Sequence, residues 1–173
     1  PLAYLTGHKE FYGLDLVVDA RVLDPRPDTE TLVEWALEVL PHETSARVID
    51  LGTGSGAIAL ALKAARPHLT VIALDYSTDA LAVAQANAQR LQLDVQCIQG
   101  SWLDSVEGRF AAIVSNPPYI RADDRHLEAL THEPLQALAS GHDGLDDIRR
   151  IIAQAPEHLE PGGWLLLEHG YDQ

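Results

Sequence analysis

The apolar positions of the chain change their period along its length and divide it into a lead-in and a long alternating region. Residues 8–24 alternate loosely around Gly13, which predicts a short β-hairpin. The segment 25–28 ends this pattern, and apolar side chains three and four apart then predict a helix capped by Asp28 and running to Leu40. We therefore expect a hairpin lead-in at residues 1–28 and a main domain at residues 29–173.

From residue 47 onward, short apolar runs alternate with helical patterns. Strands are expected at residues 48–51, 70–74, 95–99, 110–115 and 164–168. Helices are expected at residues 57–65, 79–91 and 145–159, with a turn at Pro161-Gly162-Gly163. Apolar strands that are each followed by a helix imply a mainly parallel sheet covered on both faces. The predicted fold class is α/β, a doubly wound Rossmann-like domain.

Residues 120–142 carry no sustained period, and a connection of this length in a compact domain is typical of a functional loop. Its acidic and histidine side chains follow no helical or hairpin pattern of metal ligands, so we expect no metal site. The side chains considered are His126, Glu128, His132 and Glu133.

The composition argues against nucleic acid and membranes as partners of the chain. The net charge is −14, from 26 acidic and 12 basic residues, and such a surface repels nucleic acid. No apolar stretch approaches the roughly 18 residues of a membrane span. Cys97 is the single cysteine, so no intrachain disulfide is possible, which suits a reducing cytoplasm. We expect a monomer in the cytoplasm, without direct contact to nucleic acid or membrane.

A glycine-rich loop joins the first predicted strand of the alternating region to its helix. Asp50-Leu51-Gly52-Thr53-Gly54-Ser55-Gly56-Ala57 permits close approach of a ligand to the backbone. The same spacing fits a dinucleotide fingerprint, so NAD remains an alternative. Asp50 favours S-adenosylmethionine instead, since a carboxylate beneath the loop repels pyrophosphate and attracts an ammonium and a sulfonium. Asp75 could accept hydrogen bonds from ribose, and Trp102 could cover the adenine.

The tetrapeptide Asn116-Pro117-Pro118-Tyr119 follows another buried strand. Two prolines fix successive φ angles and remove two N–H donors, which leaves backbone carbonyls free to accept hydrogen bonds. The Asn116 side chain adds a carbonyl acceptor and Tyr119 a flat face. The tetrapeptide therefore predicts a rigid site for a planar amide or amino group.

Together these residues resemble the class I S-adenosylmethionine-dependent methyltransferases, and more narrowly the protein-(glutamine-N5) methyltransferases of the HemK/PrmC type. The resemblance covers nearly the whole chain. Its motifs are Leu5-Thr6-Gly7 with Glu10-Phe11, Pro25-Arg26-Pro27-Asp28-Thr29-Glu30, Asp50 to Ala57, Ser115 to Tyr119, Glu133-Pro134, Asp143-Gly144-Leu145 and Leu166-Leu167-Glu168-His169-Gly170. Departures from the usual family pattern stand at Asp24, Ser101 and Thr131.

The resemblance implies methylation of a glutamine in the Gly-Gly-Gln motif of a peptide chain release factor, with S-adenosylhomocysteine as the second product. The cofactor-binding residues implied are Asp50, Gly52, Thr53, Gly54, Ser55, Gly56, Asp75, Trp102 and Asn116. The catalytic residues implied are Asn116, Pro117, Pro118 and Tyr119. Family members also carry a helical domain before position 1 and further strands after position 173, so we expect this chain to be a catalytic-domain fragment that binds its substrate weakly.

Several alternatives stay open. The acceptor could be a glutamine of a ribosomal protein, or an amino group of DNA or RNA held by the same tetrapeptide. The chain could also be a S-adenosylmethionine-binding module without turnover, or an oxidoreductase that uses NAD.

Overall fold

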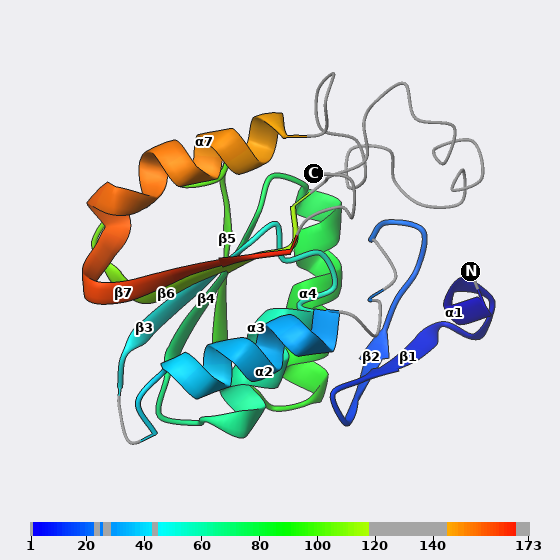
Figure 1. The fold of residues 1–173 in the computed structure, drawn as a ribbon. Coiled ribbons are helices and arrows are strands. Elements are labelled where there is room, and N and C mark those ends of the chain that lie inside the picture. Colours follow the sequence, from blue (N-terminus) through cyan, green and yellow to red (C-terminus); the bar gives the residue numbers. More distant parts are fainter. Residues whose placement is uncertain (1, 23–24, 26–28, 43–44, 118–144, 169–173) are drawn as a thin grey trace.

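The computed structural model describes residues 2–22, 25, 29–42, 45–117 and 145–168 (Figure 1). The chain begins with a short helix and a hairpin, formed by α1 (Leu2–Thr6), β1 (His8–Phe11) and β2 (Leu14–Val17). The elements that follow are α2 (Thr29–Val39), β3 (Arg47–Leu51), α3 (Ala57–Ala65), β4 (Thr70–Asp75), α4 (Thr78–Arg90), β5 (Val95–Gln99) and β6 (Phe110–Ser115). The last are α7 (Asp146–Gln154), the 3₁₀ helix η1 (Ala155–His158) and β7 (Leu159–Leu167).

The five strands that follow the hairpin form one sheet in the order β5-β4-β3-β6-β7, and every neighbouring pair is parallel. The chain runs outward from β3 to β5 and then returns to the other side of β3 with β6. The strand order therefore reverses between β3 and β6, and open α/β sheets bind their ligands at the carboxyl ends of the strands at such a point. The predicted fold class, a doubly wound α/β sheet with an N-terminal hairpin, is confirmed.

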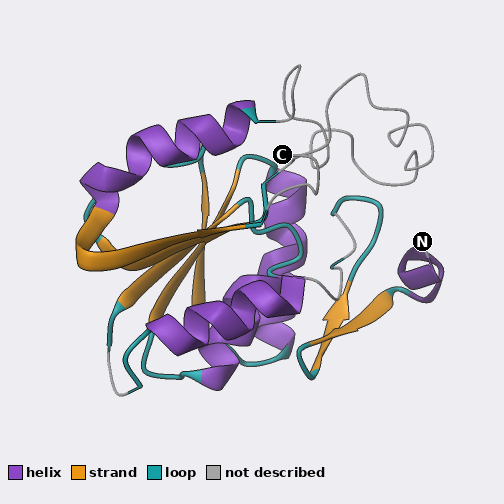
Figure 2. Ribbon diagram, viewed as in Figure 1, coloured by secondary structure: helices purple, strands orange, loops and turns teal. Residues whose placement is uncertain are grey.

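Helices cover both faces of the sheet (Figure 2). The helices α2, α3 and α4 lie on one face and α7 on the other. Side chains of β3 alternate between the two layers, since Val48 belongs to the core under α2 and α3 while Ile49 and Leu51 belong to the core under α7. Both cores are apolar, which explains why the strand sequences lack a polar face.

The hairpin is joined to this domain through buried apolar and polar contacts. Phe11 and Leu16 are buried in the same core as α2. The side chain of Asn87, on α4, accepts a hydrogen bond from Val17 N and donates one to Val17 O, over 2.8 and 3.0 Å. At the turn, Tyr12 N donates to a carboxylate oxygen of Glu30 over 2.8 Å. The lead-in is thus anchored to α2 and α4.

Three elements differ from the sequence-based prediction. The helix α1 was not expected. The helix expected at residues 145–159 ends at Gln154 and tightens to 3₁₀ geometry, because Pro156 has no N–H for an α-helical bond. The expected turn at residues 161–163 lies inside β7, where the register shifts against β6. A Cβ at Gly163 would stand 2.9 Å from the Glu160 carbonyl oxygen, so glycine permits this close approach.

The predicted cap at Asp28 and the segment 120–142 lie outside the described residues. No helix in the described part of the chain is long and apolar enough to span a membrane.

Candidate active site

The loop at residues 52–56 turns from the end of β3 across the end of β4. Its Thr53 N donates to the carbonyl of Leu74 over 2.9 Å, and its Gly56 N donates to the carbonyl of Thr53 over 2.9 Å. Gly52, Gly54 and Gly56 have φ angles of 70°, 58° and 89°. These lie in the left-handed region that side chains rarely adopt, so the loop needs glycine at all three positions.

The space around the glycines differs between the middle and the end of the loop. A Cβ at Gly54 would meet nothing within 4 Å, so the backbone there is free to contact a ligand. At Gly56 a Cβ would stand 3.1 Å from Leu60 and 3.3 Å from Ala84, which means that this glycine lets α3 approach α4. The loop therefore presents Gly54 outward and packs at Gly56.

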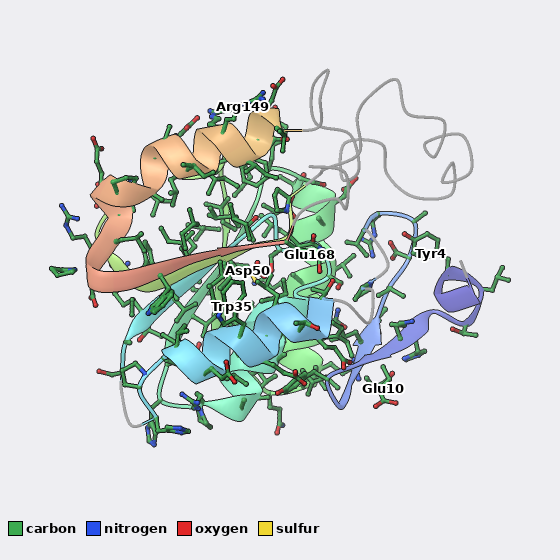
Figure 3. The ribbon with its side chains drawn as sticks, in the orientation of Figure 1. Tyr4, Glu10, Trp35, Asp50, Arg149 and Glu168 are labelled. Carbon is green, nitrogen blue, oxygen red and sulfur yellow. The ribbon has the colours of Figure 1, made fainter. Side chains whose placement is uncertain are left out.

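Asp50 lies deep in the structure, between the sheet and α2 (Figure 3). It is 1% exposed, and its Oδ2 accepts a 2.8 Å hydrogen bond from the Thr53 hydroxyl. Its Oδ1 is buried and has no partner among the described residues. The pKa of Asp50 is raised to about 7. Burial is the largest cause, the Thr53 hydroxyl and the Ala59 N–H counter part of the rise, and the nearby Asp75 adds a smaller increase. The carboxyl is thus a buried acceptor suited to a cationic group.

Asp75 ends β4 and organises the backbone around it. Its two oxygens accept hydrogen bonds from Gly54 N, over 2.8 Å, and from Ser77 N, over 2.9 Å. Burial raises its pKa, and the backbone N–H groups counter the rise. Because each carboxylate oxygen can accept a further hydrogen bond, Asp75 keeps acceptor sites beside the glycine loop.

Trp102 follows β5 and lies against the first glycine of the loop. A Cβ at Gly52 would stand 3.3 Å from Cζ3 of the Trp102 ring. The indole Nε1 donates to Oδ1 of Asp147, on α7, over 2.9 Å. The structure therefore brings the ends of β3, β4 and β5 together through Gly52, Asp75 and Trp102.

Asn116 stands on the other side of the reversal point. Leu51 and Ser115 pair in register on β3 and β6, and the Ser115 hydroxyl donates to the Leu51 carbonyl over 2.7 Å. Gly52 and Asn116 thus follow directly on neighbouring strands. The Asn116 amide Nδ2 donates to the Thr29 hydroxyl oxygen over 3.4 Å, whereas Oδ1 is buried and has no partner within the described ranges.

Of the remaining tetrapeptide residues, the structure describes only Pro117. Pro117 is buried. Pro118 and Tyr119, with the predicted aromatic face of Tyr119, lie outside the described residues.

The described residues leave polar acceptors unpaired on both sides of the reversal point, which suits a cationic donor on one side and an N–H donor on the other. Two buried carbonyl or carboxylate oxygens, on Asp50 and Asn116, lack partners on either side of the reversal point. Gly54 offers open backbone beside Asp75, to which its N–H donates. An unpaired buried oxygen costs free energy, and a bound N–H donor or cation would remove that cost.

Three side chains that contact this region were not predicted from the sequence to be site residues. Thr29 contacts Asn116, Asp147 contacts Trp102, and Asn87 donates to the Ser55 carbonyl over 3.0 Å. Thr29 belongs to a motif of the resemblance, which was the only signal for it. The other two resemble ordinary helix residues in the sequence.

Other reactive groups are less suited to catalysis. In the ranges that the structure describes, no group of three or more His, Cys, Asp or Glu side chains could hold a metal ion. The candidate ligands between residues 126 and 133 lie outside those ranges. Burial raises the pKa of the Cys97 thiol, which disfavours the reactive thiolate.

Comparisons with known proteins show the family to which the chain belongs. The model of the family described as "Methyltransferase small domain" matches residues 28–143. A release factor glutamine methyltransferase from Pseudomonas aeruginosa is 55% identical over 177 residues, which cover 100% of this chain and 64% of the relative. One from Coxiella burnetii is 51% identical over 175 residues, covering 100% of this chain and 63% of the relative.

Solved structures agree on the fold. A methyltransferase from Pyrococcus furiosus superposes with a TM-score of 0.67 at 21% identity, covering 89% of this chain and 68% of the other. The chain itself spans slightly under two thirds of the length of the curated relatives it matches.

Proposed function

This chain belongs to the methyltransferase small domain family, and from that premise we propose that it methylates the side-chain amide nitrogen of a glutamine in a peptide chain release factor. Relatives named release factor glutamine methyltransferase are about half identical over the whole chain, which supports the proposal. The chain spans less than two thirds of their length, so their activity is proposed for this chain and depends on the experiment below.

S-adenosylmethionine is the proposed donor, and it supplies an electrophilic methyl group on a sulfonium sulfur. On this proposal Asp50 and the loop from Gly52 to Gly56, with Thr53 and Ser55, hold the methionine part. Asp75 accepts hydrogen bonds from the ribose hydroxyls, and Trp102 borders the adenine. The acidic Asp50 opposes a pyrophosphate at the same loop, which argues against NAD.

The acceptor side is assigned to Asn116, Pro117, Pro118 and Tyr119. The observation that carries this assignment is the buried Asn116 Oδ1 without a partner in the described structure. A glutamine side-chain amide presents two N–H donors, and Asn116 Oδ1 with the Pro117 carbonyl provides two acceptors for them. Held in this way, the amide nitrogen is oriented for attack on the methyl carbon.

An amide nitrogen is a poor nucleophile because its lone pair is delocalised into the carbonyl. The two acceptors favour a pyramidal nitrogen as positive charge develops on it, and they are fixed before the reaction begins. The nitrogen lone pair would form the new N–C bond, and the sulfur would keep the electron pair of the methyl–sulfur bond and leave as S-adenosylhomocysteine. The methylated nitrogen would then carry two protons and would lose one of them to solvent. An N-protonated amide is very acidic, so the site needs no strong general base.

Further proposals concern the oligomeric state, the compartment and the partners of the enzyme. A monomer in the cytoplasm, without direct binding to nucleic acid, fits the net charge of −14 and the single cysteine.

The runner-up function is methylation of an amino group in DNA or RNA, since the tetrapeptide could hold such a group equally well. Duplex DNA at low salt discriminates the two, because an enzyme of nucleic acid would bind with a steep salt dependence.

One experiment tests the proposed function. The chain is titrated with S-adenosylmethionine and with NAD, and a release factor is then incubated with the chain and the donor and examined by peptide mass spectrometry. We expect binding of S-adenosylmethionine only, and one methyl group on the glutamine of the Gly-Gly-Gln peptide. A glutamine-to-asparagine release factor serves as the control. Binding of NAD, or a methylated control, would overturn the proposal.

A further inference from the structure

Trp102 has an unusual main chain. Its φ angle is 48°, in the left-handed region, where a bulky side chain is a genuine outlier. Such a conformation persists only where the surrounding contacts hold it, and residues held in this way cluster at functional sites.

The side chain of Trp102 makes one polar contact to a distant element. Its Nε1 donates to Oδ1 of Asp147 over 2.9 Å, which links the segment after β5 to the first turn of α7. The indole has only this one N–H to donate, so the position of the carboxylate fixes the direction of the ring.

The contact is part of a larger polar seam between α7 and residues 102–104. Leu103 N donates to Oε1 of Gln154 over 3.1 Å. The carboxylate of Asp104 accepts hydrogen bonds from Arg150 and Gln154. Three residues of α7 contribute to the seam, and their spacing of three and four places Asp147, Arg150 and Gln154 along one side of the helix.

The rest of α7 holds the seam in place. Its Ile148 and Ile151 are buried, and Ile151 belongs to the core between α7 and the sheet. Figure 3 shows Arg149 on the outer side of the same helix. The helix thus has an apolar side that packs on the sheet, and beside it a polar stripe that fixes the segment after β5.

We propose that Asp147 is a positioning residue for cofactor binding, which holds the indole of Trp102 against the Gly52 end of the glycine loop. The inference rests on the proposed function, in which Trp102 borders the adenine. Without its acceptor, the indole N–H loses its partner and the main chain can relax to an ordinary φ. The ring then leaves its place beside Gly52, where its Cζ3 stands 3.3 Å from the position of a Cβ.

Three variants of the full chain test this. Asp147→Ala removes the acceptor, Asp147→Asn keeps an oxygen that can accept from Nε1, and Asp146→Ala is the control from the same helical turn. Asp146 is exposed and pairs with Arg149. With S-adenosylhomocysteine as the probe in calorimetry, we expect Asp147→Ala to weaken binding by about 5- to 10-fold, as for loss of one fixed contact. Asp147→Asn and Asp146→Ala should stay within about two-fold of the parent.

Kinetics provide a second readout that general destabilisation would not reproduce. Asp147→Ala should raise KM for S-adenosylmethionine by the same factor and leave kcat at saturating donor within about two-fold. A fall in kcat at unchanged KM would overturn the proposal. Equal losses of affinity in Asp147→Ala and Asp147→Asn would overturn it as well, because the amide oxygen still accepts the indole hydrogen bond.

A third readout needs no ligand. The other tryptophans, Trp35 and Trp164, are 47% and 45% exposed, and replacing both by phenylalanine leaves Trp102 as the only indole. In that background Asp147→Ala should make the fluorescence more accessible to acrylamide, and Asp147→Asn should not. Unchanged quenching in Asp147→Ala overturns the positioning role. If the parent chain binds no S-adenosylhomocysteine, the proposed function fails, and quenching still decides whether Asp147 holds the ring.

Discussion

The Thr53 hydroxyl donates a 2.8 Å hydrogen bond to Oδ2 of Asp50, while Oδ1 of the same carboxyl has no partner in the described part of the chain. Burial is the largest cause that raises the pKa of Asp50 to about 7. Near neutral pH the carboxyl therefore exists in both protonation states. A bound cation beside Oδ1 would favour the ionised state.

The raised pKa of Asp50 predicts how stability depends on pH. An unfolded aspartate has a pKa of about 3.9, so between about pH 4 and 7 the folded chain binds more protons than the unfolded chain. The contribution of Asp50 to the free energy of unfolding therefore falls as pH rises through this range, by about 1 kcal/mol per pH unit.

Chemical denaturation at several pH values checks this prediction. In Asp50→Asn, which keeps an acceptor for the Thr53 hydroxyl, the difference from the parent should grow in favour of the variant as pH rises from 5 to 7. Parallel profiles for the two proteins would show that Asp50 does not titrate in this range.

Asn87 is predicted to be a stability residue that also fixes the glycine loop. It is fully buried, and its side-chain amide accepts a hydrogen bond from Val17 N and donates to the carbonyls of Val17 and Ser55. Asn87→Ala leaves all three backbone groups unpaired and should lower the free energy of unfolding by about 2–3 kcal/mol. Gln85→Ala, an exposed position on the same helix, should change it by less than about 0.5 kcal/mol. Urea denaturation measures both, and similar values for the two would refute the role of Asn87.

Thr29 is predicted to orient the amide of Asn116. Its hydroxyl oxygen accepts from Nδ2 over 3.4 Å, which leaves Oδ1 turned away from Thr29. Thr29→Val has the same shape without the acceptor and should lower kcat by about 10-fold, whereas Thr29→Ser should keep most of the activity. Initial rates of release factor methylation at saturating substrates measure this. A Thr29→Val enzyme as active as Thr29→Ser would show that the hydroxyl is not needed.

Much of the fold could be predicted from the sequence because its signals are local. The bounds of α3, β5 and β6 agree with the prediction, since apolar runs there meet glycine, proline or charged residues at both ends. The predicted end of α7 was wrong because the apolar pattern continues past Pro156. The missing N–H of Pro156 ends the α-helix. The register shift between β6 and β7 was missed because Gly162 and Gly163 are typical of a turn.

The candidate site was predictable only in part. Asp50 and Asp75 lie near the carboxyl ends of apolar strands and Asn116 directly follows one, and the ends of parallel strands meet at one edge of a sheet. The partners that hold the site were not predictable, because Thr29 and Asn116 are 87 residues apart and Trp102 and Asp147 are 45 apart. Asp147 in particular reads as an ordinary acid in the first turn of a helix.

The central claim is that Asn116 Oδ1 accepts a hydrogen bond from the substrate amide as its nitrogen is methylated. The most direct measurement is single-turnover methylation of a release factor by Asn116→Ala, under conditions where calorimetry shows that S-adenosylmethionine is still bound. We predict a rate about 100-fold below that of the parent, as for loss of one preorganised polar contact in a transition state. A rate within a few-fold of the parent, with the donor bound, would contradict the claim.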